Sequence, residues 1–508
     1  MEQKQIDWST FATCSGVILL VCLPLALYPE TGGQIVLTAY QFISTEFGFL
    51  YMLAGVAVTI FLLRLAFGRY GKIVLGEDGD KPEFSDYSWA AMLFCAGIGG
   101  GLMFWAPVEW AYYLEAPPFG VDAGSVRAAE WAAAYGLFHW GPTAWCFYGL
   151  PTIAIAYAFY VKRVPFLRLS ASCRCVIGTN EESGAARIID FLFMIALLGG
   201  AGSSIGFTTP LIAACISRLT GIDNGFGLEV FAVFLCVGLF STSVWMGLRK
   251  GIKRLSDINL GLALALLAFV LIVGPTVFIL KTSVESVGLM LANIVRLNTW
   301  TDALTESNFT ETWTIWYWAW WIAYGPFVGL FVTRISRGRT IRKVILGMIG
   351  YGSLGAMLFY MVLGNYGLSL EWFETLSVTT VLDEQGQALA VVAILGQLPW
   401  PGIAIAVFCI VTVVFTATTY DSASYILAAS ATRQIGVGDD PARWHRLFWA
   451  AALAVIPLTL MFAGRLADDP RAGLTVVQTA TLVASFPILF VGILMSVSLL
   501  KQLRADHS

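Results

Sequence analysis

Two stretches of the chain are rich in aromatic residues, at a spacing that could enclose an organic cation. Residues 139–148 read HWGPTAWCFY, and residues 313–327 read WTIWYWAWWIAYGPF. A trimethylammonium group has no N–H donor, so hydrogen bonds cannot hold it. The negative faces of aromatic rings attract it by about 0.5–2 kcal/mol per desolvated ring. The two stretches therefore predict a site for a methylated cation, with ordinary packing of large rings as the alternative.

Helical spacing decides which of these rings can meet. Trp145 and Tyr148 are three residues apart and share a helix face, and Gly141-Pro142 bends the chain so that Trp140 can converge on them. Trp321 lies about 12 Å beyond the start of the second stretch at 1.5 Å per residue, which is near the middle of a bilayer. The four rings are therefore predicted to meet at half depth.

The outer end of the second stretch has a different expectation. Most tryptophans of membrane helices belong to belts at the lipid–water interface, and Trp313 and Trp316 are predicted to do so.

A second set of residues suits an alkali cation or a carboxylate. Residues 97–101 read GIGGG, and each glycine costs a helix interior roughly 1 kcal/mol relative to alanine, so the helix is expected to unwind there. Backbone groups of Gly97, Gly99 and Gly101 would then be open to a ligand. Residues 415–422 (FTATTYDS) offer the hydroxyls of Thr418 and Thr419. Close helix packing and hydroxyls bonded to their own helix remain the alternatives.

Acidic residues inside apolar segments are expensive, so Asp421 and Glu109 are functional candidates. His139 is expected to be an ordinary buried histidine with its hydrogen bonds satisfied. The three histidines, at 139, 445 and 507, are scattered, and no nucleophile has a matched base. An enzyme is not expected.

The composition identifies lipid as the solvent of this chain. Of 508 residues, 58% are hydrophobic and 12% are charged, against about 45–50% and 25% in soluble domains. A net charge of −3 gives no basic field, which excludes nucleic acid as an expected partner. No cofactor is expected apart from a coupling ion.

Apolar runs long enough to cross a bilayer recur along the chain and predict an all-α membrane protein with twelve transmembrane helices. The predicted spans are 11–29, 46–68, 89–114, 129–161, 188–217, 227–248, 257–280, 312–333, 341–366, 401–431, 444–464 and 473–500. With both termini in the cytoplasm, 24 of the 30 lysines and arginines fall on the cytoplasmic side. A multi-pass protein of the bacterial inner membrane is therefore expected.

The spans divide the chain into four parts. Residues 1–82 hold two peripheral N-terminal helices, and residues 83–281 and 312–508 hold five spans each. Between them, residues 282–311 are expected to contain an outer amphipathic helix that lies along the interface. A weak echo, Gly97-x-x-x-Gly101 against Gly325-x-x-x-Gly329, opens the two five-span units. Either the units are repeats with interrupted first helices or both motifs are packing faces.

These motifs together resemble one family. Residues 316–321 (WYWAWW), 326–329 (PFVG) and 334–339 (RISRGR) are similar to the signature of the betaine/choline/carnitine transporters. The resemblance extends over nearly the whole chain. It implies a sodium-symporter-like core of two inverted five-helix repeats, alternating access and commonly a homotrimer.

The resemblance also implies residue roles. The aromatic box of the family corresponds to Trp140, Trp145, Tyr148 and Trp321. Trp320 and Tyr324 would line the path of the substrate. Gly101 is similar to members that carry betaine. A sodium site would use carbonyls of Cys95 and Ile98 with hydroxyls of Thr418 and Thr419, and a second sodium site would involve Phe327.

Two readings of the transport mode follow. Sodium-independent exchangers of this family carry an arginine in the fifth span, and no basic residue lies between Arg187 and Arg218 here, which favours sodium-coupled uptake of a quaternary ammonium or sulfonium solute such as glycine betaine. Glu109-Trp110 and Pro117-Pro118-Phe119 look closer to the exchanger branch, so a sodium-independent carnitine-type antiporter is the alternative.

Overall fold

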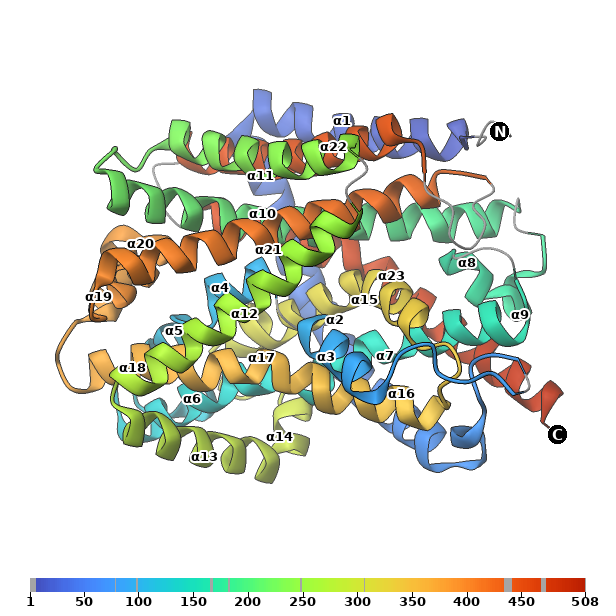
Figure 1. Cartoon of the computed structure of the whole chain (residues 1–508), viewed down its shortest axis with the longest axis horizontal. Helices are drawn as coiled ribbons and strands as arrows, with labels where there is room; N and C mark the ends of the chain where they lie inside the picture. The colour runs from blue at the N-terminus through green and yellow to red at the C-terminus, as the bar shows by residue number, and fades with distance from the viewer. Residues whose placement is uncertain are drawn as a thin grey trace.

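The regular structure of this chain is helical throughout the part that the computed structural model describes. That part comprises residues 6–77, 79–96, 99–164, 168–180, 183–246, 249–305, 307–433, 441–466 and 472–507. Two isolated β-bridges, Ile6 to Thr432 and Val74 to Thr340, are the exceptions within it. Long helices run along the longest axis of the molecule in stacked layers (Figure 1). The predicted all-helical class is confirmed.

The helices of the first half are α1 (Trp8–Leu27), α2 (Pro29–Phe67), α3 (Asp86–Ala96), α4 (Gly100–Trp105), α5 (Glu109–Glu115), α6 (Val126–His139), α7 (Pro142–Ala156), α8 (Leu169–Ser172), α9 (Arg174–Ile177), α10 (Gly184–Thr220), α11 (Phe226–Met246) and α12 (Arg249–Val273). Short 3-10 or π-helical segments among them are η1 (Arg69–Lys72), η2 (Pro118–Gly120) and η3 (Tyr157–Val161).

The helices of the second half are α13 (Thr276–Ala292), α14 (Ile294–Thr299), α15 (Trp316–Ile335), α16 (Ile341–Gly347), α17 (Ser353–Phe359), α18 (Asn365–Trp372), α19 (Val378–Gln385), α20 (Gln387–Leu395), α21 (Pro401–Ser430), α22 (Arg443–Leu466) and α23 (Ala472–Asp506). The π-helical segments η4 (Thr310–Ile315), η5 (Met348–Gly352) and η6 (Tyr360–Gly364) join several of them into longer helical runs.

Within the described residues, seven helical runs are long and apolar enough to cross a membrane. They are Gln34–Phe67, Val126–Val161, Gly184–Thr220, Thr310–Ile335, Ile341–Trp372, Pro401–Ser430 and Leu482–Asp506. The bent pair Asp257–Val273 and Thr276–Ala292 makes eight if it counts as one span. The chain is therefore a multi-pass helical membrane protein.

The glycine-rich segment 97–101 interrupts a helix, as its composition predicts. Helix α3 ends at Ala96 and α4 begins at Gly100, with Gly99 in an extended conformation at φ −150° and ψ 178°. Gly97 and Ile98 lie outside the described residues. A second interruption separates α4 from α5, so the predicted span 89–114 consists of three short helices.

The matching motif Gly325-x-x-x-Gly329 does not interrupt its helix. Helix α15 continues through Pro326, because a proline in a membrane helix is tolerated where neighbouring helices support the backbone. A Cβ at Gly329 would lie 2.9 Å from Thr152 N, and one at Gly325 would lie 3.1 Å from Phe147 O. This motif is a packing face against α7, so the expectation of an interrupted first helix holds in one unit only.

The bend between α12 and α13 lies earlier than the predicted end of the seventh span. The predicted span 257–280 ends at Val273, and after Gly274-Pro275 the chain turns by 111° into α13. Proline has no N–H for the helix ladder and restricts the residue before it, which ends a helix. The outer segment 282–311, which was predicted to contain an amphipathic helix, thus includes the second part of α13 and all of α14.

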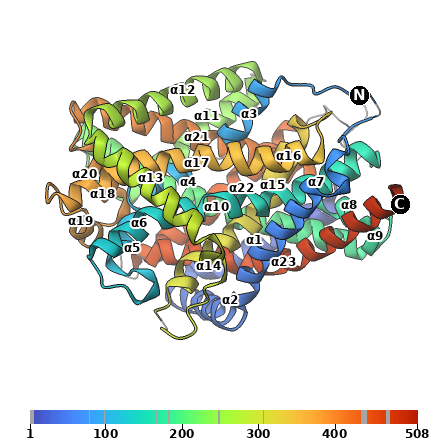
Figure 2. The same cartoon turned by 90° about the horizontal axis from the view of Figure 1, so that it is seen from below.

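The site region lies in the interior around α7 and α15, which pack against each other. Helix α10 packs against α4, α15, α21 and α23. In the view from below, α12 lies along one edge of the molecule and α2 along the opposite edge (Figure 2). The central helices are therefore shielded by neighbours on several sides.

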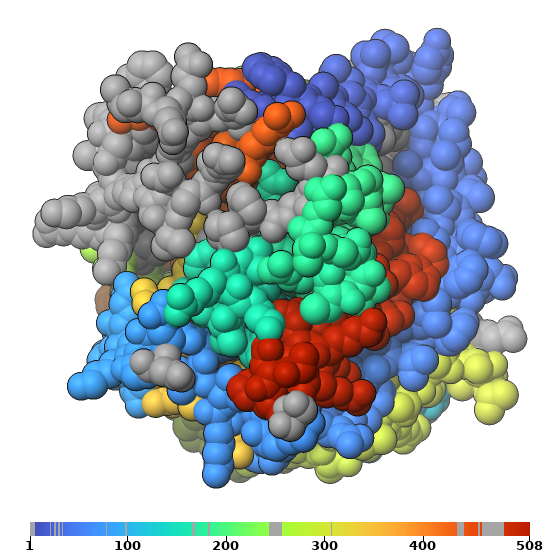
Figure 3. Space-filling model, turned by 90° about the vertical axis from the view of Figure 1, so that its right-hand side faces the viewer, coloured from blue at the N-terminus to red at the C-terminus, as the bar shows by residue number. Residues whose placement is uncertain are grey.

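The start of α1 and the end of α23 lie at the same end of the molecule, and α18, α19 and α20 lie at the other (Figure 1). Looking onto the first end, α23 lies beside the segment that contains α8 and α9 (Figure 3). Asp506 accepts hydrogen bonds there from Tyr157 Oη at 2.6 Å and Lys162 Nζ at 2.5 Å.

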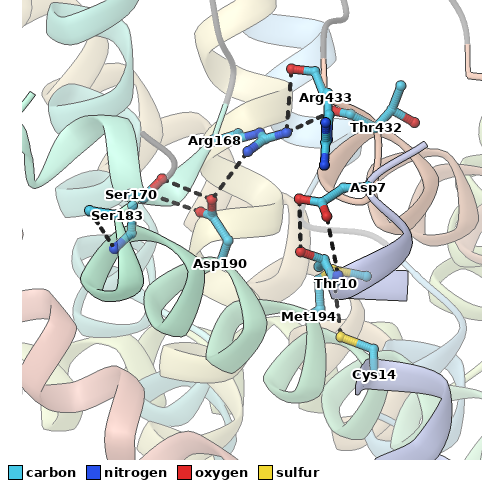
Figure 4. Close-up of polar contacts among 11 residues, drawn as sticks. Asp7, Thr10, Cys14, Arg168, Ser170, Ser183, Asp190, Met194, Thr432 and Arg433 are labelled. Carbon is cyan, nitrogen blue, oxygen red and sulfur yellow. Dashed lines mark hydrogen bonds and ion pairs between the residues drawn. The ribbon is translucent and has the colours of Figure 1, made fainter. Parts of the chain in front are cut away.

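Arg168 links three segments at this end (Figure 4). Its guanidinium donates to Thr432 O at 2.8 Å and lies 3.9 Å from Asp190 Oδ2. Asp190 also accepts hydrogen bonds from Ser170 N and Ser170 Oγ, at 3.0 and 2.8 Å. The loop before α8 is thereby tied to the N-terminal part of α10 and to the end of α21.

Candidate functional site

A sharp elbow between α6 and α7 places Trp140. Helix α6 ends at His139, and α7 begins at Pro142, where a proline suits the first helical turn. A Cβ at Gly141 would lie 2.3 Å from Leu137 O, so no other residue fits this elbow without a shift. The elbow aims the Trp140 ring at α15, as the spacing predicted.

Trp321 is the centre of the predicted aromatic site. Its ring centroid lies 4.8 Å from that of Trp140 and 5.7 Å from that of Tyr148, and both rings meet it nearly at right angles, at 74° and 83°. Trp321 Nε1 donates to His139 O at 2.8 Å, which fixes its orientation. All three residues are buried. The rings converge in the interior and form an aromatic corner.

Trp145 contacts the aromatic corner through Tyr148. Its ring meets Tyr148 edge-on at 5.4 Å. The Trp145 ring also packs on Gly352 in η5, where a Cβ would lie 2.4 Å from Trp145 Cε2. The Trp145 ring can therefore occupy this position because residue 352 has no side chain.

The two residues expected to line the path lie next to the corner. Trp320 stacks on Trp321 at 5.0 Å and 12°, and Tyr324 meets Trp320 edge-on at 6.4 Å. Trp320 Nε1 donates to Gly200 O at 3.3 Å. These rings extend the aromatic surface along α15 toward α10.

The interrupted segment before α4 meets this surface. A Cβ at Gly101 would lie 3.0 Å from the Trp320 ring, whereas one at Gly99 would have no heavy atom within 4 Å. Gly100 lies against Thr208 and Thr416, whose hydroxyls bond to their own helices. Gly99 therefore borders open space, and Gly101 supports Trp320.

The proposed ion ligands belong to α3, α15 and α21, except Ile98, which lies outside the described residues. Thr418 Oγ1 and Thr419 Oγ1 both donate to Phe415 O, at 2.9 and 3.0 Å, which leaves their lone pairs free to accept. Cys95 is in the last turn of α3. Phe327 meets Tyr324 edge-on at 5.2 Å.

Glu109 forms a hydrogen-bond network that was not predicted from the sequence. Its side chain is fully buried. Tyr113 Oη donates to Oε1, and the hydroxyls of Tyr317 and Tyr360 donate to Oε2. His139 Nδ1 lies 2.9 Å from Tyr113 Oη and 3.7 Å from Glu109 Oε1. One signal was available, because Tyr113 lies one helical turn from Glu109.

Asp421, the other acidic candidate, has a structural partner. Arg446 of α22 donates to Asp421 Oδ1 at 2.5 Å, and its guanidinium lies 5.4 Å from the ring of Tyr425. The carboxylate thus joins α21 to α22.

The expectation for Trp313 and Trp316 is wrong. Both are buried, with exposed fractions of 7% and 1%. Their rings pack against Trp105 at 5.9 and 5.3 Å, and Trp313 also meets Tyr113 at 4.9 Å. They belong to the protein interior rather than to an interfacial belt, because other segments cover the outer end of this helix.

Comparison with known proteins shows the family to which the chain belongs. The model of the betaine/carnitine/choline family transporters matches residues 9–508. The chain therefore belongs to this family of secondary transporters of quaternary ammonium compounds, which are not enzymes.

Two relatives illustrate the similarity. A carnitine transporter of Acinetobacter baumannii is 34% identical over 485 residues, which cover 95% of this chain and 86% of that protein. The uncharacterized transporter YeaV of Escherichia coli is 35% identical over 447 residues, which cover 88% of this chain and 91% of that protein.

Proposed function

We propose that this chain takes up a quaternary ammonium or sulfonium solute, such as glycine betaine, by sodium-coupled alternating access. The observation that carries the proposal is the aromatic corner of Trp140, Tyr148 and Trp321 in the protein interior. Two rings that each meet a third at a steep angle can contact a methylated head group from more than one direction, and such contacts do not need an N–H donor on the ligand.

The corner must open to receive this ligand. A cation bound between two rings lies over both of them, within about 6 Å of each centroid. The centroids of the Trp140 and Trp321 rings are only 4.8 Å apart, so these rings contact each other and leave no room for a cation between them. Trp321 is held by its bond to His139 O, so Trp140, Trp145 and Tyr148 are the rings that rotate aside. The backbone at Gly97, Gly99 and Gly101 would face the carboxylate of a betaine.

Sodium is the coupling ion that the residues support. Thr418 and Thr419 present adjacent oxygens on α21, and the carbonyls of Cys95 and Ile98 would complete the site from the end of α3. A second ion would lie near Phe327. On α10, no arginine or lysine lies between Arg187 and Arg218 to substitute for an ion.

A carnitine-type substrate:product antiporter is the second candidate. It is favoured by the Glu109-Trp110 sequence and by the relative that is named a carnitine transporter. Carnitine also carries a trimethylammonium group, so the same rings would bind it.

The proposed architecture has twelve spans and both termini in the cytoplasm of a bacterial inner membrane. The seven long runs are supplemented by the bent pair, the apolar helices Trp8–Pro24 and Phe226–Thr242, the interrupted run α3 to α5, and α22. Spans three to seven and eight to twelve would form the inverted repeats. A homotrimer would use α2 and α13, both of which expose large apolar side chains.

Reconstituted protein tests the transport mode. Proteoliposomes should accumulate labelled glycine betaine, choline or carnitine only under an inward sodium gradient. Sodium-indifferent exchange against internal carnitine would instead establish the antiporter. Current that rises linearly with voltage and does not saturate with substrate would contradict both candidates and indicate a channel.

A further inference from the structure

The Glu109 network contains a continuous hydrogen-bonded path between two titratable groups. Glu109 Oε1 meets Tyr113 Oη, which meets His139 Nδ1 at 2.9 Å, and His139 Nε2 lies 3.0 Å from Thr314 Oγ1. Every side chain on this path is buried. Among the described residues, His139 is the ion-pair partner of Glu109. The path can therefore carry a proton.

Two proton arrangements satisfy every bond on this path. In the first, Tyr113 donates to the Glu109 carboxylate, and His139 Nδ1–H donates to Tyr113. In the second, Glu109 Oε1–H donates to Tyr113, and the Tyr113 hydroxyl donates to Nδ1 of a histidine protonated on Nε2. A proton taken from water turns a neutral Nδ1–H histidine into its cation. Shifting one proton from Nδ1 to Tyr113 and one from Tyr113 to Glu109 then gives the second arrangement. The net charge of the path changes from −1 to 0.

The network directly adjoins the proposed cation site. The Tyr317 ring, whose hydroxyl donates to Glu109 Oε2 at 2.5 Å, stacks on Trp321 at 5.7 Å and 25°. The Trp140 ring lies 6.0 Å from Tyr317 and 5.9 Å from Tyr360. The Tyr317 ring thus connects the Glu109 carboxylate to Trp321, and charges in a buried region are screened less than in water. A charge at Glu109 therefore acts on a cation held by Trp321.

We propose that the Glu109–Tyr113–His139 path holds one exchangeable proton, and that this proton and the cationic substrate antagonise each other's binding. The inference rests on the proposed function, since it requires a cation at Trp321. The Glu109 carboxylate supplies a counter-charge for the bound head group. When the site holds no substrate, the proton neutralises this carboxylate instead. By linkage, substrate binding releases the proton, and proton binding weakens the affinity for substrate by the same factor.

Neighbouring elements bring other ionisable groups to the surroundings of the path. Helix α6 brings Tyr135, whose ring lies 5.8 Å from Tyr113 and 5.3 Å from His139. Arg296 and Asp302 act electrostatically on Tyr135 from the outer segment. Helix α19, which packs against α5, carries the acidic residues Asp383 and Glu384. Helix α13, which packs against α6, carries Lys281 and Glu285, and η4, which carries Thr314, also carries Glu311. Helix α5 itself carries Tyr112 and Glu115, and the phenols Tyr317 and Tyr360 belong to the network.

The proton can be detected without any substrate. Infrared difference spectra of the purified full-length protein between high and low pH should contain a carboxylic acid band that Glu109→Gln removes. Glu130→Gln is the matched control, because Glu130 is an exposed carboxylate on α6. Absence of a band specific to Glu109 would overturn the exchangeable proton.

Substrate binding tests the antagonism. The affinity of the wild type for choline, which has no carboxyl group of its own, should rise by up to about tenfold per pH unit within the titration window. Calorimetry in two buffers of different ionisation enthalpy should report up to one proton released per choline. Glu109→Gln should bind choline with a weak affinity that does not depend on pH, whereas Glu130→Gln should follow the wild type.

A second variant guards against misfolding of the first. Tyr360→Phe keeps the ring but removes one donor to the carboxylate, so the affinity transition should move to higher pH. A transition that stays in place in Tyr360→Phe, or a choline affinity independent of pH in the wild type, would overturn the antagonism. Failure of choline, glycine betaine and carnitine to bind at any pH would refute the proposed function and the antagonism with it, while the infrared band would still decide whether Glu109 exchanges a proton.

Discussion

At the scale of single residues, Trp321 connects the proposed cation site with the buried network behind it. Trp140 and Tyr148 meet its ring, and Tyr317 stacks on it. Its Nε1 is held by the carbonyl of His139, whose imidazole faces Tyr113. Substitutions at this residue therefore test ligand binding directly.

Trp321→Ala should lose binding of every trimethylammonium ligand. Removing the ring deletes up to about 2 kcal/mol of cation–π attraction, about thirtyfold in the dissociation constant, and also leaves Trp140 and Tyr148 without their shared contact. Isothermal calorimetry with glycine betaine, choline and carnitine measures the effect. Trp372→Ala, at an exposed tryptophan that ends α18, is the control, and an equal loss there would contradict a local role.

Gly352→Ala should weaken the same ligands by displacing one wall. The added Cβ would lie 2.4 Å from Trp145 Cε2, and overpacking of this kind costs about 1–3 kcal/mol. Gly350→Ala, in the same segment with nothing within 4 Å of its Cβ, should behave as wild type. Competition binding compares the two variants, and identical affinities would show that Trp145 does not shape the site.

Spacing along the sequence predicted the convergence of the aromatic rings but not the network around Glu109. Trp145 and Tyr148 share one helix, and the Gly141-Pro142 elbow between them and Trp140 was visible. Tyr317 and Tyr360 reach Glu109 from distant elements, and no local periodicity brings such residues together. Whether Cys95, Ile98, Thr418, Thr419 and Phe327 bind sodium stays a prediction.

At the scale of elements, composition predicted the helix break between α3 and α4, where the glycines of 97–101 decide the backbone conformation. It did not predict that Gly274-Pro275 ends α12, because the expected span 257–280 runs through that pair. The sequence also did not predict that α15 continues through Pro326, because that depends on the fit against α7. The belt assigned to Trp313 and Trp316 was wrong for a related reason, since the sequence does not reveal which segments cover a helix end.

Gly329→Ala should destabilise the protein through the contact of α15 with α7. The new Cβ would lie 2.9 Å from Thr152 N, and a backbone neighbour cannot move aside cheaply, so we expect a loss of about 1–3 kcal/mol. Thermal unfolding in detergent measures it. Gly288→Ala in α13 is the matched control, because it meets nothing within 4 Å and should be neutral or stabilising by up to about 1 kcal/mol.

At the scale of the whole molecule, a buried arginine ties the start of α3 to the loop between α15 and α16. Arg339 donates to Asp86 Oδ1 at 2.6 Å and to Phe84 O at 2.7 Å, and its guanidinium lies 4.2 Å from the ring of Trp89. Lys343 also donates to Asp86, at 2.7 Å.

Because of these contacts, the stability of the folded protein should depend on pH in the acidic range. Hydrogen bonds from Lys343 and then Arg339 lower the pKa of Asp86, which lies outside the predicted span, from 3.8 to about 2. A carboxylate with a lowered pKa stabilises the folded state above its unfolded value, so this contribution should disappear as the pH falls from 3.8 to about 2. Unfolding temperatures across that window should fall more for the wild type than for Asp86→Asn. Parallel curves would exclude the contribution.

The shared location of the two chain ends has a consequence for labelling. Because the start of α1 and the end of α23 lie at one end of the molecule (Figures 1 and 2), dyes attached at both would occupy the same aqueous compartment. An impermeant quencher added outside sealed cells would reach both dyes or neither. If the external quencher leaves the fluorescence of both dyes unchanged, and quenches both after permeabilisation, both ends are assigned to the cytoplasm in one measurement.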